Sequence, residues 1–410
     1  MNRRDFLKAA AATTAAIPFV GNANPAFSKQ SHMSEGPQVS RRELPNTGIS
    51  LPLLGYGMMR LPTAGNKIDY EKGRALVHRA MQAGLNYFDT AYMYHGGESE
   101  KFCGDVLSEF PRDSYYLASK LPCGGFKSEA DNERVFNDQL QKCKTDYFDF
   151  YLLHNMNAGA WRNALDKKSV EFVIKMQEQG KIRKLGFSFH DRYQVLEDIA
   201  SYRKWDFTLI QLNVFDWDTY YAKEQYEILT KLNIPVFVME PLRGGRLAHL
   251  TPEATNILKA ANPNASSASW AFRFVASLPN VACVLSGMTH MDHLVENIGT
   301  FSNFKPLDEN EQKTLKQAME AYFKMGAIPC TNCRYCVPCP AEIDIPRQLT
   351  IYNEYQMNKN KWQFKQIYNN IKPDSRADQC EECETCIKKC PQKINIPAEL
   401  KKVAELYKSI

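Results

Sequence analysis

Strand-like and helix-like segments alternate along most of this 410-residue chain, and this alternation limits its fold more than any other feature. Short apolar runs rich in β-branched and aromatic residues are separated by amphipathic stretches of helical length, several of which end at glycine. The runs lie at 53–59, 87–91, 115–121, 148–154, 182–189, 209–215, 235–242 and 281–287. Eight strand–helix units of this kind predict a (β/α)8 barrel.

A short hairpin is predicted before the first of these runs, between Val39 and Leu54. Pro45, Asn46, Thr47 and Gly48 supply its turn. A doubly wound open sheet is the alternative fold, but no Gly-x-Gly-x-x-Gly fingerprint follows the first strand. The formal charge of +5 is spread along the chain without a basic stripe of interleaved aromatics, which argues against nucleic-acid binding.

The first 28 residues are predicted to be a targeting segment outside the fold. A twin-arginine start is followed by a modest alanine-rich stretch, too short and weakly apolar to span a membrane. Arg3 and Arg4, followed by Phe6, Leu7 and Lys8, resemble the signal of the Tat route, which exports folded proteins. The resemblance implies a periplasmic protein with no transmembrane segment in its mature chain. A disordered basic tail is the alternative.

Four polar residues stand at the predicted C-terminal ends of the second to fourth strands, where a (β/α)8 barrel carries its chemistry. They are Asp89, Tyr94, Lys120 and His154. Each alone has an ordinary structural explanation. Together they suit carbonyl reduction: a lysine ammonium lowers the pKa of the tyrosine that protonates the alkoxide, a carboxylate holds the ammonium, and a histidine orients the carbonyl oxygen.

These residues lie in stretches that resemble the aldo-keto reductases over residues 39–305. The stretches are NYFDTAYMY, ASKL, DYFDFYLLH, IRKLGFS, LIQLN, PLRGGRL and LSGMTHMDHLVENI. The resemblance implies that Tyr94 is the general acid of a tetrad and that NAD(P)H lies across the barrel mouth. It places ten further residues at the cofactor: Gly57, Ser188, Gln211, Pro241, Leu242, Gly244, Leu247, Gly287, Glu296 and Asn297. Ser188 and Gln211 would bind the nicotinamide carboxamide, and Glu296 and Asn297 the adenine end.

The chain departs from the family pattern at three places. Phe189 and His190 follow Ser188, where the family commonly has Ser-Asn. Met239 replaces an aromatic residue that stacks on nicotinamide in many relatives. Gly287, Met288 and His293 stand where NADPH-preferring members place Lys, Ser and Arg, which leaves a 2′-phosphate poorly paired. The choice between NADH and NADPH therefore stays open.

Eight of the twelve cysteines fall in two groups near the C-terminus, which predicts a separate module at 330–410 after a helical linker at 306–329. The second group has the full C-x2-C-x2-C-x3-C-P spacing of a 4Fe-4S ligand run, and the first is a copy with one residue missing. In a dicluster ferredoxin the fourth cysteine of each run ligates the other cluster. Two clusters are therefore predicted, with these ligand sets: Cys330, Cys333, Cys336 and Cys390, and Cys380, Cys383, Cys386 and Cys339.

Two structural zinc sites or four disulfides are alternative uses of these cysteines. The remaining four, Cys103, Cys123, Cys143 and Cys283, are expected to be small buried residues of the barrel. The predicted function is a carbonyl and alcohol oxidoreductase with a small-molecule substrate and an electron-transfer partner protein for the clusters. The alternative is a redox-sensing or electron-carrying protein whose barrel binds nicotinamide with little turnover.

Overall fold

The computed structural model describes residues 36–45, 47–218, 221–324 and 326–410; the predicted signal at 1–28 and Asn46 of the predicted turn lie outside them. Eight parallel strands form a closed barrel in the order β10-β11-β12-β3-β6-β7-β8-β9, which confirms the predicted fold. The strands are β3 (Leu54–Gly57), β6 (Tyr87–Asp89), β7 (Tyr116–Leu121), β8 (Phe148–Met156), β9 (Ile182–Phe189), β10 (Phe207–Gln211), β11 (Val236–Met239) and β12 (Val281–Ser286).

The predicted N-terminal hairpin consists of β1 (Arg41–Leu44) and β2 (Ile49–Pro52), which pair antiparallel. Leu44, Ile49 and Leu51 are buried with side chains of the barrel interior such as Phe150 and Phe237. The hairpin therefore extends the hydrophobic core of the barrel. A second, shorter hairpin joins β4 (Thr63–Ala64) to β5 (Lys67–Ile68).

Helices surround the barrel. They are α2 (Tyr70–Gln82), α3 (Glu98–Leu107), α4 (Ala130–Lys142), α5 (Ala158–Asp166), α6 (Ser169–Glu178), α7 (Tyr193–Tyr202), α8 (Ala222–Lys231), α9 (Pro252–Ala261), α10 (Ser267–Ser277) and α11 (Met291–Phe301). Many begin at capping side chains, as α2 does at Asp69, which accepts from the Lys72 backbone N–H. The segment predicted as a linker contains α12 (Glu309–Phe323), which begins with a capping box of Asp308 and Glu311. Leu315 and Met319 of α12 share a hydrophobic cluster with α9 and α10.

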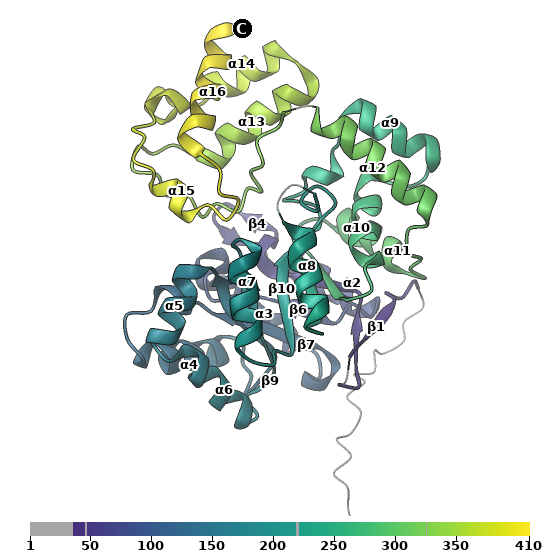
Figure 1. Cartoon of the computed structure of the whole chain (residues 1–410), viewed down its shortest axis with the longest axis vertical. Coiled ribbons are helices and arrows are strands. Elements are labelled where there is room, and N and C mark those ends of the chain that lie inside the picture. Colours follow the sequence, from purple (N-terminus) through teal and green to yellow (C-terminus); the bar gives the residue numbers. More distant parts are fainter. Residues whose placement is uncertain (1–35, 46, 219–220, 325) are drawn as a thin grey trace, which may run out of the picture.

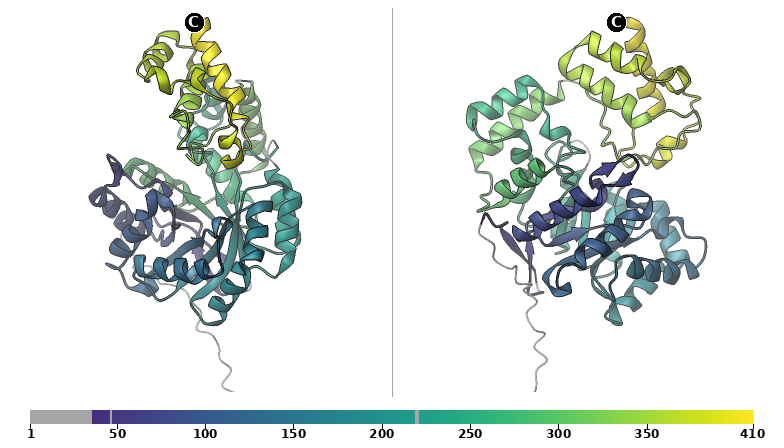
Figure 2. Two further views of the ribbon diagram at one scale, coloured as in Figure 1. Left: turned by 90° about the vertical axis from the view of Figure 1, so that its left-hand side faces the viewer. Right: turned by 180° about the vertical axis from the view of Figure 1, so that it is seen from behind.

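The C-terminal module is mostly helical, as predicted, with α13 (Ile345–Asn358), α14 (Lys361–Asn369), α15 (Thr385–Lys389) and α16 (Ile396–Ser409). Figure 1 shows these helices grouped apart from the barrel, and both views of Figure 2 agree. The repeat after each Cys-Pro step has the same structural effect in both copies: Asp344 caps α13 and Asn395 caps α16, each accepting from a backbone N–H three residues on.

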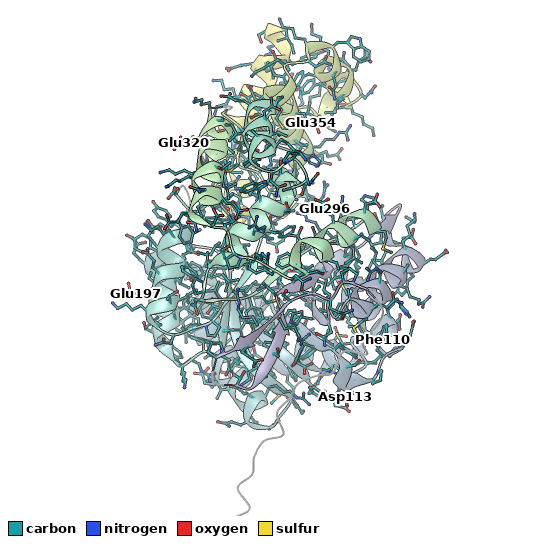
Figure 3. All side chains as sticks on the ribbon, turned by 90° about the vertical axis from the view of Figure 1, so that its right-hand side faces the viewer. Phe110, Asp113, Glu197, Glu296, Glu320 and Glu354 are labelled. Carbon is teal, nitrogen blue, oxygen red and sulfur yellow. The ribbon has the colours of Figure 1, made fainter. Side chains whose placement is uncertain are left out.

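The module lies over the C-terminal ends of the barrel strands. Glu354 on α13 and Asp113, which precedes β7, mark opposite ends of the molecule in Figure 3. The module has its own hydrophobic cluster, which includes Leu349, Phe364 and Val403. Among the described residues, no helix combines the length and apolar character needed to cross a lipid bilayer.

Candidate active site

The four predicted catalytic residues converge at the barrel mouth. Asp89 ends β6, Lys120 belongs to β7 and His154 to β8, while Tyr94 begins the 3-10 turn Tyr94–Gly97 after β6. The Lys120 Nζ atom donates to Asp89 Oδ1 at 2.6 Å and to the Thr90 carbonyl oxygen at 2.7 Å. Both side chains of this ion pair are almost fully buried, so the position of the ammonium is fixed.

Tyr94 lies close to both Lys120 and His154. The Lys120 Nζ atom is 4.7 Å from the centroid of the Tyr94 ring, and the rings of Tyr94 and His154 meet edge to face with centroids 6.0 Å apart. All four residues line one cavity of ≈ 110 Å³, here called the tetrad cavity. The arrangement places a hydroxyl and an imidazole side by side around a space that a small carbonyl group can enter.

Burial dominates the electrostatics of these groups. The pKa of Tyr94 is raised well above its usual value by burial and then by Asp89 and Glu240, whereas Arg60 lowers it. The expectation of a lowered Tyr94 pKa is therefore wrong for this structure, because burial, Asp89 and Glu240 raise the pKa more than Arg60 lowers it. The pKa of His154 is far below its usual value because of burial, then Lys120 and His190, so its imidazole is neutral.

Nine of the ten residues assigned to the cofactor line two adjoining cavities. Gly57, Ser188, Gln211 and Gly287 line the tetrad cavity. Gly287 also lines a cavity of ≈ 430 Å³, here called the cofactor cavity, together with Pro241, Leu242, Gly244, Glu296 and Asn297. Leu247 lines neither cavity, because its side chain is 1% exposed and packs in the cluster beneath α12. The two cavities share Arg60, Glu240, Leu285 and Gly287 in their linings, so they lie next to each other.

The two residues assigned to the nicotinamide carboxamide already have protein partners. Ser188 Oγ accepts from the Asn155 backbone N–H at 2.7 Å. Gln211 and Gln392 exchange hydrogen bonds through their primary amides, at 2.9 and 2.7 Å, and Gln211 also donates to Asp216 at 2.6 Å. Gln392 belongs to the C-terminal module, so this pair joins the module to the barrel at the active site.

Further contacts hold the C-terminal module on the barrel mouth. The Thr331 carbonyl oxygen accepts from Arg60 Nη2 at 3.1 Å. The same oxygen lies 2.2 Å from the position that a Cβ atom on residue 244 would take, so only glycine fits at this position. Thr331, Cys333 and Tyr335 line the tetrad cavity from above. The module is therefore part of the active site.

The two cysteine groups of the module lie near each other in the structure. Burial raises the pKa of the Cys336 thiol, and the neighbouring Cys333, Cys330 and Cys390 raise it further, which places these four thiols together. The other set, Cys339, Cys380, Cys383 and Cys386, lines a small cavity together with Cys336 of the first set. Each set offers the four thiolates that a 4Fe-4S cluster requires.

A single metal ion requires ligands that lie close together. A zinc ion with Zn–S bonds of about 2.3 Å requires sulfur atoms roughly 4 Å apart. Among the described residues, no three His, Cys, Asp or Glu side chains are arranged to hold one metal ion.

Comparisons with known families agree with the fold. The model of the Aldo/keto reductase family matches residues 53–320, well over half of the chain. The chain belongs to the aldo/keto reductase family. A 4Fe-4S dicluster domain matches residues 329–395, and a twin-arginine translocation signal matches residues 1–17. This combination confirms the architecture inferred from the sequence.

Similar proteins cover the barrel of this aldo/keto reductase. The uncharacterized oxidoreductase YqkF of Bacillus subtilis is 26% identical over 67% of this chain and 95% of its own. The L-galactose dehydrogenase of Arabidopsis thaliana is 25% identical over 68% of this chain and 93% of its own. Among solved structures, the holo form of an aldo-keto reductase from Bacillus halodurans has a TM-score of 0.59, with 22% identity over 68% of this chain and 96% of that one.

Two residues that line these cavities, Glu240 and Gln392, are not predicted from the sequence. Glu240 follows β11 directly, and it approaches Arg60 at 3.8 Å on the wall shared by the tetrad and cofactor cavities. Its φ of 56° is left-handed, an unusual conformation for glutamate that is often found at functional sites. The rule that selected Asp89 and His154, a polar residue at the end of a barrel strand, would also have found Glu240. No local signal marked Gln392.

Proposed function

We propose that this protein transfers hydride between NAD(P)H and a carbonyl or alcohol substrate at the tetrad cavity. One observation carries the proposal: the buried Lys120–Asp89 pair, Tyr94 and His154 surround a cavity that adjoins a larger one lined by the residues assigned to the cofactor. The bound nicotinamide would supply or accept the hydride. The residues of the chain would then bind the substrate oxygen and move its proton.

Tyr94 is the proton donor in this mechanism. Its raised pKa keeps the phenol protonated at neutral pH, which suits protonation of the oxygen of a carbonyl as it is reduced. Neutral His154 carries one N–H donor that can orient the same oxygen. Lys120, held by Asp89 and the Thr90 carbonyl, stabilises the negative charge that develops on the oxygen and the phenol.

Two 4Fe-4S clusters are proposed in the C-terminal module, one in each cysteine set. They would supply one-electron transfer, and we propose an electron-transfer partner protein as their exchange partner, because nicotinamide passes two electrons as hydride. The Tat signal supports export of the folded protein, and we propose the periplasm as its destination. The domain boundaries proposed are 1–28 for the signal, 39–305 for the barrel, 306–329 for the linker and 330–410 for the module.

The test compares the wild-type protein with the Tyr94→Phe variant, which keeps the ring and loses the hydroxyl. Both are purified anaerobically and assayed for nicotinamide oxidation with a panel of aldehydes and ketones. We expect the variant to lose at least about 100-fold in kcat, the typical contribution of a general acid. A matched Tyr202→Phe variant on exposed α7 should retain full activity.

An electron-carrying protein that binds nicotinamide with little turnover is the second candidate. The contact between Gln211 and Gln392 favours it, because it occupies a residue assigned to the nicotinamide carboxamide. Equal rates in the wild type and Tyr94→Phe would support this candidate over the reductase. In that case the reduced protein should still pass electrons to a one-electron acceptor.

A further inference from the structure

A third cavity lies between the barrel and the C-terminal module, and its volume is ≈ 580 Å³. We call it the interdomain groove. Its walls come from residues 189–192 at the end of β9, from β10, α8 and the segment between them, from Pro329, and from residues 391–399 of the module. It shares His190, Gln211, Pro391 and Gln392 with the tetrad cavity, but no residue with the cofactor cavity. The tetrad cavity therefore lies between the cofactor cavity and the groove.

Polar groups of both signs line the groove. Arg192 and Lys393 contribute positive charge, and Asp191 and Glu399 contribute negative charge. A third carboxylate of the lining, Asp216, is paired with Arg243 at 2.8 Å. Glu399 Oε1 accepts from Lys402 Nζ at 2.9 Å, whereas its Oε2 atom is buried without a partner among the described residues. A buried acceptor of this kind requires a donor. Because a charged ligand would meet repulsion from one sign or the other, this lining favours a neutral ligand that donates and accepts hydrogen bonds.

His190 stands where the groove meets the tetrad cavity. Its backbone N–H donates to the Met156 carbonyl at 2.9 Å, but its ring has no hydrogen bond within the described part of the chain. Burial, followed by the charge of Lys393, lowers its pKa to about 4. At neutral pH the ring is therefore uncharged and offers one donor and one acceptor, both of which a hydroxyl group can use.

We propose that the interdomain groove binds the distal part of the substrate, which is a neutral carbonyl compound or alcohol bearing several hydroxyl groups, and that His190 binds the hydroxyl next to the reacting carbon. This inference rests on the proposed function, since it places the reacting carbon beside Tyr94. Hydroxyls farther along the substrate donate to Glu399 and accept from Lys393. The C-terminal module thus forms half of the substrate site.

The first test uses the full-length protein with its clusters and compares glyceraldehyde with propanal, which has the same carbon chain without hydroxyls. In His190→Phe we expect the KM for glyceraldehyde to rise about tenfold, the loss of one or two hydrogen bonds, and the KM for propanal to change less than about twofold. His78→Phe is the matched control, since His78 lies on α2 and pairs with Glu109. Equal changes for both substrates, or for neither, would overturn the inference.

The second test measures binding without turnover, so that the two proposals can fail separately. Saturation-transfer NMR with xylitol should give a signal for wild type and Tyr94→Phe, a weaker one for His190→Phe and Glu399→Gln, and an unchanged one for His78→Phe. Absence of xylitol binding to the wild type refutes the groove as a hydroxyl-binding site. Intact binding with turnover that does not depend on Tyr94 refutes the reductase proposal and leaves the groove standing. Unaltered iron content in each variant shows that the module is folded.

Discussion

Replacing Gly244 with alanine should loosen the C-terminal module from the barrel. Gly244 has a φ of +69°, so any side chain there is strained, at a cost of about 1 kcal/mol. Its Cβ would also lie 2.2 Å from the Thr331 carbonyl oxygen, whereas ordinary contacts begin at 3.4 Å, so that Thr331 must retreat by about 1.2 Å. Overpacking of this kind costs a further ~1–3 kcal/mol.

Gly245 provides a matched control. Its φ is +92° and nothing lies within 4 Å of the position that an alanine methyl group would take, so Gly245→Ala carries the backbone strain without the clash. In hydrogen exchange on the anaerobic protein, peptides that contain Thr331 should exchange faster in Gly244→Ala than in Gly245→Ala. The free energy of unfolding should fall by about 2–4 kcal/mol in the first variant and by about 1 kcal/mol in the second. Identical exchange in the two variants would refute the docking argument.

Three further outcomes are expected. Asp89→Asn leaves the buried Lys120 ammonium without its counter-charge and should lower the free energy of unfolding in urea by about 3 kcal/mol. Adding Lys120→Met should recover part of this loss, and no recovery would contradict a stabilising role for the ion pair. The pKa of His190 is lowered to about 4, so between pH ~6.5 and 4 the unfolded chain binds a proton that the folded protein does not. The free energy of unfolding of the wild type should therefore fall as the pH drops through this range, and it should fall more steeply than that of His190→Gln. Cys339→Ser should remove about half of the iron and sulfide while Cys103→Ser in the barrel removes none, and unchanged iron in the first would exclude Cys339 as a ligand.

The barrel and the tetrad could be predicted because their signals are local. Each strand is a short apolar run, and Asp89, Lys120 and His154 sit at or near the ends of such runs, so that the barrel topology alone brings them together. The crosswise cysteine sets remain a prediction from two copies of one spacing pattern. In these cases the information lies within a few residues of each site.

The covering of the active site could not be predicted in this way. Gln211 and Gln392 are separated by 181 positions, and their contact depends on how two separately cored modules dock. The sequence near Gly244 also gives no sign that the Thr331 carbonyl lies against it. The pKa of Tyr94 was misjudged for a related reason, because its burial and the approach of Glu240 depend on tertiary structure.

The short run from Cys390 to Gln392 would couple insertion of a cluster to completion of the substrate pocket. Cys390 belongs to a proposed cluster, while Pro391 and Gln392 form part of the wall of the tetrad cavity. A chain that has not received its iron lacks the constraint that holds this run in place, so it would reach the export machinery with an incomplete substrate pocket. Cofactor insertion in the cytoplasm would thus decide whether the exported protein is catalytically competent, and oxidative loss of the cluster afterwards would disable the barrel together with the electron carrier.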